Sequence, residues 1–425
     1  MRSYAIIGFG CAGFHALRAI RGIDPEGVID VYSEHQDPPY NPMLTTYYAS
    51  NRLSAEGLFP FGDLKSIGQE FNANINSETR VTALDAQTKT ITLADGTSRS
   101  YDRILIATGA RAFVPPLPIE CPEAVITMRN LGDARDLRAR LDKGGIRRAV
   151  VIGASMAGIK VAEAFSNNGI PVVLGDMAPR IFPLAAYPET AERIEAKLKE
   201  DGLVMHFKKG LTAIHRGDEL TAKVEFSDGT FEEADCVALC IGTRAATELA
   251  AAAGIAVTRA IEVNESMETS VPGIYAAGDC CQGNELQSGQ HMIVGLWANA
   301  AYQGDTAGAN MAGGKSSFSG NILHNITHFY NMDFIGFGDN RIKGEQIFFE
   351  NEKKGLWIQG VLSEGKLAGI NILGSYRISG ILKNHILSII QDGEHHISPI
   401  QRGVLLKEGL TEEFLRKLEG GSNGN

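Results

Sequence analysis

Two stretches of the chain repeat the same order of apolar and polar positions. Each opens with a short apolar run, which is typical of a buried parallel strand. A glycine-rich turn follows, then an apolar stretch at helical spacing, then a second strand that ends in an acidic residue. The pattern therefore predicts two β–turn–α–β units in one chain. The predicted strand, helix and strand are 4–7, 14–21 and 27–32 in the first unit, and 149–152, 159–168 and 171–174 in the second.

The repeat extends beyond these units. An Asp-Gly turn between apolar alternations, at Asp95-Gly96 and again at Asp228-Gly229, predicts a β meander in each half. An apolar segment at 271–279 predicts a return strand of the first sheet. We therefore predict an α/β fold with two Rossmann-like doubly wound domains, the second inserted in the first, and a smaller α+β C-terminal domain. The predicted parts are 1–115 and 245–318 (first domain), 116–244 (second domain) and 319–425 (third domain, with strands at 334–337 and 356–361, a helix at 381–390 and a frayed tail at 420–425).

Composition narrows the class of protein. The chain has 425 residues and no run of about 18 apolar residues, so it predicts no membrane-spanning helix. The N-terminus leads into a strand instead of a signal peptide, which favours the cytoplasm. A formal charge of −10 disfavours nucleic acid or an anionic membrane surface as partner. Six cysteines without a C-x-x-C pair argue against a disulfide framework, and we expect no metal site.

The first glycine turn has the spacing of a dinucleotide fingerprint. Gly8 permits the tight turn, Gly10 lets the backbone approach a pyrophosphate, and Gly13 packs helix against strand. The N-terminus of the helix then receives the phosphate charge. Glu34, at the end of the second strand, is placed to bind a ribose.

The second fingerprint has Gly153, Ser155 and Gly158, with serine in place of the middle glycine. A serine still permits close backbone approach and can donate to a phosphate. Asp176 occupies the position of the ribose-binding acid and would repel a 2′-phosphate, which favours NADH over NADPH. Arg180 could partly offset this preference. Alternatively, Asp176 and Arg180 are solvated loop charges.

Four segments resemble the signatures of the FAD-dependent pyridine nucleotide-disulfide oxidoreductases. Within that superfamily the chain is similar to rubredoxin reductases, ferredoxin reductases of oxygenase systems and the FAD-NAD domains of nitrite reductase large subunits. Residues 39–44 and 295–301 support this second resemblance. The four signature segments are 8–13, 107–111, 153–158 and 274–279.

The resemblance implies FAD in the first domain and NADH in the second. It implies that Asp279 binds the flavin ribitol and that a helix starting near Trp297 directs its N-terminal dipole at the flavin, since a reduced flavin is anionic. Trp297 could instead be a packing residue. The remaining cofactor-binding residues expected are Val81, Thr108, Gly109 and Gly242.

Three positions depart from the family. Met43 stands where relatives that reduce peroxide or coenzyme A disulfide carry a cysteine, and a thioether cannot cycle through a thiolate. Lys160 stands where a glutamate is usual, and Met156 where an aromatic residue gates the nicotinamide. Lys160 is either a charge partner of the flavin, which we take as the catalytic prediction, or a lysine on the helix surface. A redox role for Cys280-Cys281 is disfavoured.

These features predict an enzyme that passes electrons from NADH through FAD to a small redox protein (ferredoxin, rubredoxin or a Rieske component). The expected partners are NADH, that redox protein and a second copy of the chain in a homodimer. Alternatives within the enzyme class are a direct NADH oxidase and a flavoprotein subunit of a larger dehydrogenase. An alternative of another class is a flavin-binding redox sensor like apoptosis-inducing factor.

Overall fold

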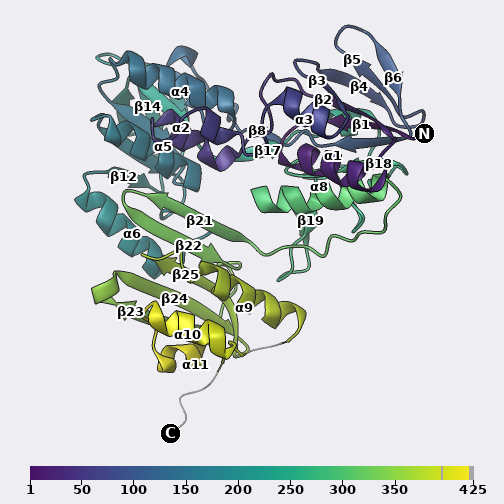
Figure 1. The fold of residues 1–425 in the computed structure, drawn as a ribbon. Helices are drawn as coiled ribbons and strands as arrows, with labels where there is room; N and C mark the ends of the chain where they lie inside the picture. The colour runs from purple at the N-terminus through teal and green to yellow at the C-terminus, as the bar shows by residue number, and fades with distance from the viewer. Residues whose placement is uncertain (394–395, 421–425) are drawn as a thin grey trace. The chain divides into compact units, whose positions relative to one another are not determined.

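The chain folds into two compact units in the computed structural model, which describes residues 1–393 and 396–420 (Figure 1). The predicted tail beyond residue 420 lies outside the described residues. The first unit contains Met1–Ala112, Arg129–Arg135 and Thr243–Asn321. The second contains Phe113–Met128, Asp136–Gly242 and the described residues from Ile322 onward.

A parallel sheet of order β18-β7-β1-β2-β3 forms the core of the first unit. Its strands are β1 (Ser3–Ile7), β2 (Val28–Tyr32), β3 (Asn74–Asn76), β7 (Arg103–Ile106) and β18 (Ile274–Ala276). Because β18 pairs with β7, the chain returns to this sheet after the second glycine unit, as the sequence pattern predicted.

Two helices, α1 (Cys11–Ile23) and α8 (Trp297–Met311), lie side by side in the first unit (Figure 1). Small residues allow this close approach: a Cβ on Gly304 would lie 2.3 Å from the Ala12 carbonyl oxygen, and one on Gly308 would lie 2.4 Å from that of Ala16. The other elements of this unit are η1 (Pro42–Leu44), α2 (Thr45–Ala49), η2 (Glu56–Leu58), α3 (Leu64–Glu70), the meander β4 (Val81–Asp85), β5 (Thr90–Leu93) and β6 (Ser98–Ser100), the pair β8 (Ala110–Ala112) and β17 (Thr243–Ala245), α7 (Glu248–Ala252), β19 (Gly283–Asn284) and β20 (His291–Met292).

The second unit repeats the arrangement with a parallel sheet of order β12-β11-β10-β16-β9. Its central strand, β10 (Ala149–Ile152), is fully apolar and buried, as expected for a strand covered on both faces. The remaining elements of this part are η3 (Pro122–Ala124), β9 (Val125–Thr127), α4 (Leu131–Lys143, which begins in the first unit), α5 (Met156–Asn167), β11 (Val172–Asp176), α6 (Pro188–Glu200), β12 (Val204–Phe207), the meander β13 (Leu211–Arg216), β14 (Ala222–Phe226) and β15 (Phe231–Ala234), and β16 (Cys236–Leu239).

An antiparallel sheet of order β21-β22-β25-β24-β23 completes the second unit. The structure groups this α+β part with the second glycine unit, so the predicted division into three domains stays a prediction. Its elements are β21 (His324–Phe329), β22 (Met332–Phe337), β23 (Glu345–Asn351), η4 (Glu352–Lys354), β24 (Leu356–Ser363), β25 (Lys366–Leu373), α9 (Ser379–Gln391), α10 (Pro399–Lys407) and α11 (Glu412–Leu418).

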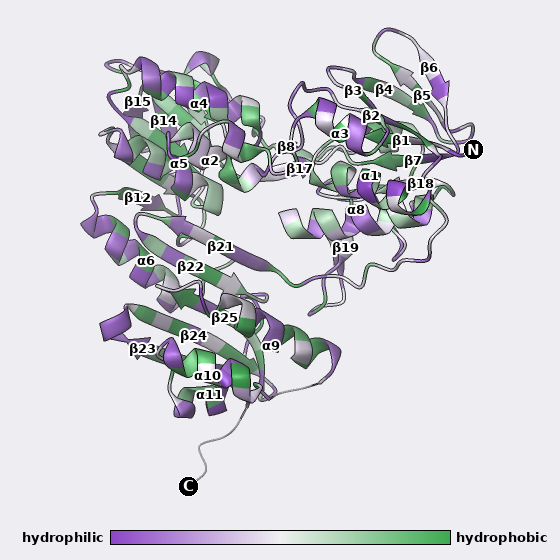
Figure 2. Cartoon of the chain, in the orientation of Figure 1, coloured by the Kyte–Doolittle hydropathy of each residue, from purple (hydrophilic) through white to green (hydrophobic). Residues whose placement is uncertain are grey.

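Hydropathy differs between the buried strands and the partly exposed helices. Strands β1 and β7 are mostly hydrophobic, whereas α6 is mostly hydrophilic and buries only one side (Figure 2). Among the described residues, no helix is long and apolar enough to cross a membrane.

Candidate functional site

The first glycine turn, between β1 and α1, combines tight packing with an open face. A Cβ on Gly8 would lie 2.2 Å from the Ala107 carbonyl oxygen, and one on Gly13 would lie 2.2 Å from the Gly8 carbonyl oxygen. Gly8 also has a φ of 103°, which favours glycine. A Cβ on Gly10 would meet no atom within 4 Å, and no side chain caps the helix that begins at Cys11. The turn therefore leaves backbone N–H groups and space for a pyrophosphate, and it fits a dinucleotide.

The first unit also brings together residues expected at the flavin. The Arg129 guanidinium donates to Asp279 at 2.6 Å and to the Ala110 carbonyl at 3.0 Å. Trp297 is the first residue of α8, and its ring stacks on Phe61 at 6.0 Å. Its indole Nε1 is buried without a hydrogen-bond partner, and such a donor is normally satisfied. A ligand acceptor would satisfy it, so these residues fit a flavin cofactor.

Sequence reasoning missed Arg129. It lies in the short segment 129–135 that belongs to the first unit although its neighbours in the chain belong to the second. No sequence motif near Arg129 indicates that the chain returns to the first unit at this point.

Further predicted cofactor-binding residues lie in loops or at the start of a strand. Glu34 follows β2, is exposed and lies 3.9 Å from Arg80. The Thr108 hydroxyl donates to the Ala246 carbonyl at 2.7 Å, so it ties the segment after β7 to the one after β17. Val81 is the first residue of β4, Gly109 has a φ of 68°, and Gly242, in the second unit, has a φ of 105°.

The second glycine turn, between β10 and α5, repeats the geometry of the first. A Cβ on Gly153 would lie 2.3 Å from the Cys240 carbonyl oxygen, and one on Gly158 would lie 1.8 Å from that of Gly153. The Ser155 hydroxyl accepts from the Gly158 N–H at 3.2 Å and donates to the Cys240 carbonyl at 3.0 Å. Ser155 is therefore the N-cap of α5. Met156 follows it, half-buried, as the first residue of the helix.

Asp176 ends β11 beside this turn. Its carboxylate accepts from the Ala154 N–H at 2.6 Å and from the Ala178 N–H at 2.8 Å. The Nε of Arg180 is buried without a hydrogen-bond partner. Both residues are half-buried, and their roles at the coenzyme stay predictions. The acid is fixed where a coenzyme ribose is expected.

Lys160 lies inside the second unit and is only 6% exposed. Its Nζ donates to Glu163 at 2.6 Å and to the His328 carbonyl of β21 at 2.7 Å. The second Glu163 oxygen accepts from the Tyr330 N–H at 3.0 Å. The alternative of a lysine on the helix surface is therefore wrong. The role as charge partner of the flavin stays a prediction, now for an ammonium group already paired with a carboxylate.

The six cysteines are buried free thiols, and the hydrogen bond with Cys281 lowers the pKa of Cys280. Met43, which the resemblance places at a cysteine position, lies in η1 and is 57% exposed. Burial raises the pKa of the Cys11 thiol to about 12, so this group stays protonated at neutral pH. Cys280 and Cys281 are buried free thiols, and each donates to a backbone carbonyl, at 3.3 and 3.4 Å respectively.

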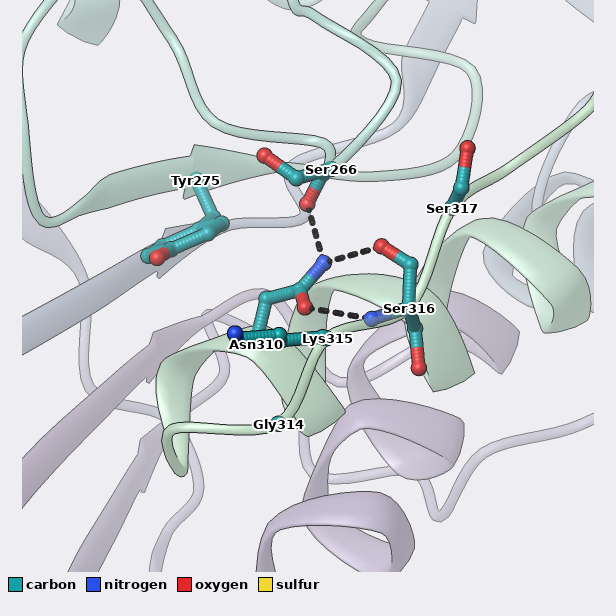
Figure 3. Close-up of a pocket in the computed structure, with 7 residues that line it drawn as sticks. All are labelled: Ser266, Tyr275, Asn310, Gly314, Lys315, Ser316 and Ser317. Carbon is teal, nitrogen blue, oxygen red and sulfur yellow. Dashed lines mark hydrogen bonds between the residues drawn. The ribbon is translucent and has the colours of Figure 1, made fainter.

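A polar hollow lies at the opposite end of α8 from Trp297 (Figure 3). The Asn310 amide at its centre donates to the carbonyls of Ser266 and Ser316 and accepts from the Ser316 N–H. The Asn310 amide is thus bonded within the hollow, and none of the predicted cofactor residues lines it. Among the described residues, no group of three or more metal-binding side chains is present.

Residues 2–304 match the pyridine nucleotide-disulphide oxidoreductase family. The chain belongs to this family. FAD and NADH binding are typical of it, and the predicted family is confirmed. Several curated relatives are named as NAD(+) reductases that act with rubredoxin or ferredoxin. The ferredoxin–NAD(+) reductase subunit of the benzene 1,2-dioxygenase system of Pseudomonas putida is 31% identical over 300 residues, 70% of this chain and 72% of the relative. An NADH oxidase of Methanocaldococcus jannaschii is 27% identical over 395 residues, 88% of both chains.

Solved structures confirm the predicted fold class. The water-forming NADH oxidase of Lactobacillus brevis, bound to NADH, has a TM-score of 0.86 at 21% identity and covers 96% of this chain and 99% of its own. The covalent putidaredoxin reductase–putidaredoxin complex has a TM-score of 0.84 at 23% identity, with 100% and 99% covered. At these identities the comparison shows the fold alone.

Proposed function

We propose that the protein oxidises NADH and passes the electrons through FAD to a small redox protein, with ferredoxin, rubredoxin or a Rieske component as the acceptor. One observation carries the proposal: two glycine turns of the same geometry lie on one chain, and Asp176 is fixed beside the second by two backbone N–H groups. When bound, FAD supplies the conversion between hydride transfer and single-electron transfer.

The residues of the first unit would bind and orient the flavin nucleotide. The backbone at Gly10 and the N-terminus of α1 receive the pyrophosphate, and Asp279, oriented by Arg129, receives the ribitol hydroxyls. Trp297 supplies an indole N–H, and the N-terminus of α8 stabilises negative charge by roughly 0.3–1 kcal/mol. Glu34, Val81, Thr108 and Gly109 are proposed as further contacts.

The residues of the second unit would bind the pyridine nucleotide. Gly153, Ser155 and Gly158 form the turn that meets its pyrophosphate, and Asp176 accepts hydrogen bonds from the adenosine ribose. Gly242 is proposed as a further contact. The positive φ at Gly153 and Gly242 permits close backbone approach.

The sulfur groups of the chain do not supply a redox partner for the flavin. We therefore place the electron acceptor outside the chain. Met43 cannot form a thiolate, Cys11 is held protonated, and Cys280 and Cys281 are buried. Relatives named rubredoxin-NAD(+) reductase and ferredoxin–NAD(+) reductase support a redox protein as acceptor.

A direct NADH oxidase is the second candidate, favoured by the relative of that name. A flavoprotein subunit of a larger dehydrogenase is supported by the epsilon subunit of the NADH-dependent phenylglyoxylate dehydrogenase of Aromatoleum evansii, 27% identical over 389 residues. A redox sensor, a homodimer, a cytoplasmic location and the lack of a nucleic-acid partner stay predictions.

Steady-state NADH oxidation tests the choice of acceptor. We expect turnover with an added ferredoxin or rubredoxin to exceed turnover with dissolved oxygen at least tenfold. Oxygen as the faster acceptor would make the protein an NADH oxidase. Flavin reduction without sustained turnover on any acceptor would favour the sensor.

A further inference from the structure

The loop that follows Asp176 contains a strained phenylalanine. Phe182 lies in the loop between β11 and α6 (residues 177–187, the β11–α6 loop) and has a φ of 48°. This left-handed conformation is rare for a bulky residue and persists only where surrounding contacts hold it. Such strain commonly accompanies a functional site. The contacts of Phe182 therefore indicate what the strain achieves.

The backbone of Phe182 reaches the glycine turn. Its N–H donates to the Ala154 carbonyl at 2.9 Å, and the Ala154 N–H in turn donates to Asp176 at 2.6 Å. The Phe182 carbonyl accepts from the N–H groups of Ala185 and Ala186, at 2.9 and 2.8 Å. Phe182 thus joins the turn that bears the ribose-binding acid to the rest of the loop.

The ring of Phe182 reaches the C-terminal sheet. The residue is 2% exposed. Its ring packs edge-on against Phe329 of β21 at 5.3 Å and in a tilted arrangement against Phe334 of β22 at 5.2 Å. Aromatic pairs at these separations contribute more than their buried area alone. Residues far along the chain from the glycine turn therefore hold the strained residue in place.

Two asparagines of the C-terminal part hold the backbone of the same loop. Asn371 of β25 is 1% exposed, accepts from the Tyr187 N–H at 2.7 Å and donates to the Ala185 carbonyl at 3.0 Å. The Asn340 amide donates to the carbonyls of Pro183 and Ala186, at 3.1 and 3.0 Å. A buried amide with both ends bonded fixes its partners, because breaking either bond leaves an unsatisfied group.

We propose that Phe182 is a positioning residue for the pyridine nucleotide, and that the C-terminal sheet is thereby part of the coenzyme site. Phe329, Phe334 and Asn371 hold Phe182 and its loop, and Phe182 holds Ala154 and Asp176. The inference rests on the proposed function, since it assigns NADH to the second glycine turn.

Stopped-flow reduction of the FAD-loaded protein by NADH under anaerobic conditions tests this inference. Both Phe182→Leu and Phe329→Leu are expected to raise the apparent Kd for NADH about tenfold, which equals about 1.4 kcal/mol, and to leave the limiting rate of flavin reduction within about twofold. Because the two rings touch, the double variant is expected to raise Kd by far less than the product of the single effects.

Arg193→Ala is the matched control. Arg193, on α6, pairs with Glu350 at 2.7 Å and lies 3.7 Å over the ring of Trp357, so it joins the same two parts of the second unit without touching the β11–α6 loop. It is expected to lower Tm and leave Kd unchanged. An unchanged Kd in Phe182→Leu and Phe329→Leu, with only Tm lowered, would overturn the inference. If Phe182→Leu does not fold, Phe329→Leu decides alone. If NADH does not reduce the wild-type flavin, the proposed function fails as well.

Discussion

Asp176 determines the choice between NADH and NADPH in this account. Its carboxylate is fixed by two backbone N–H groups, so it cannot turn away from a 2′-phosphate without losing both bonds. We expect NADH to reduce the flavin at least tenfold more efficiently than NADPH, and Asp176→Ala to remove about that factor, since 1.4 kcal/mol is tenfold. Stopped-flow reduction with both donors measures this. Equal efficiencies in the wild type would contradict the assignment.

Substitutions of Lys160 and Glu163 test whether this buried ion pair acts on the flavin. A cation near the flavin favours its anionic reduced form, so Lys160→Met is expected to lower the midpoint potential and Glu163→Gln to raise it. We expect shifts on the order of 30 mV, which is about 1.4 kcal/mol for a two-electron couple. Spectroelectrochemical titration measures both variants. Potentials that do not move would give the pair a purely structural role.

The residues found from the sequence are those that a local motif identifies. Gly8 and Gly153 each follow a short apolar strand and Asp176 ends one, so their positions were predictable. Arg129 and Phe182 were not, because their roles depend on contacts with residues more than one hundred positions away. Such contacts leave no periodic pattern in a single sequence.

The close packing of α1 against α8 predicts that a residue larger than Gly304 destabilises the protein. A Cβ on Gly304 would lie 2.3 Å from a backbone oxygen of α1, so Gly304→Ala must push the helices apart. We expect a loss of about 1–3 kcal/mol in the free energy of unfolding, as for other overpacked sites. Gly22→Ala in α1 is the control, because its Cβ would meet no atom within 4 Å and the change should not destabilise. Urea unfolding of both variants measures the difference, and equal stabilities would contradict the packing.

His215 links β13 to two carboxylates and predicts a pH dependence. Its ring lies 3.2 Å from Glu120 and 3.1 Å from Glu225, and hydrogen bonds to Glu225 and Glu120 raise its pKa above the usual value. The stabilisation is therefore complete below about pH 6.5, the value in the unfolded chain, and is lost as pH rises through the raised pKa. His215→Gln should lower Tm at pH 6 and leave it unchanged at pH 9. A Tm difference that is the same at both values would contradict this.

The elements of the C-terminal part were only partly predictable from the pattern of apolar residues. The sequence predicted strands at 334–337 and 356–361 and a helix at 381–390, and the structure extends all three into β22, β24 and α9. It missed β25, in which Asn371 interrupts an apolar run. A buried asparagine looks like a break in a strand unless its partners are known, and here they lie in the β11–α6 loop.

At the scale of the whole molecule, repetition made the architecture predictable. Two copies of the same strand–turn–helix pattern, each followed by a meander, indicated two doubly wound sheets, and both sheets are present. The grouping of the described residues from Ile322 onward with the second sheet was not predictable. It depends on side-chain contacts such as those of Lys160 and Phe182, whose partners are distant in sequence.

The number of electrons that the protein accepts distinguishes a flavin acting alone from a flavin–thiol pair. Met43 cannot replace a redox cysteine, and the buried thiols of Cys280 and Cys281 donate to backbone carbonyls. The flavin is then the one two-electron centre that the account provides. The variant in which both cysteines are replaced by serine serves as the control and should behave like the wild type.

Anaerobic titration of the FAD-loaded protein with NADH tests whether NADH reduces the flavin and whether the flavin accepts electrons alone. We expect one NADH per FAD to bleach the yellow flavin completely, with no long-wavelength thiolate-to-flavin absorption midway. An oxidised flavin that persists in excess NADH would contradict the assignment as an NADH-dependent flavoenzyme. Uptake of four electrons per FAD, falling to two in the double serine variant, would show instead that the paired cysteines take part in the reaction.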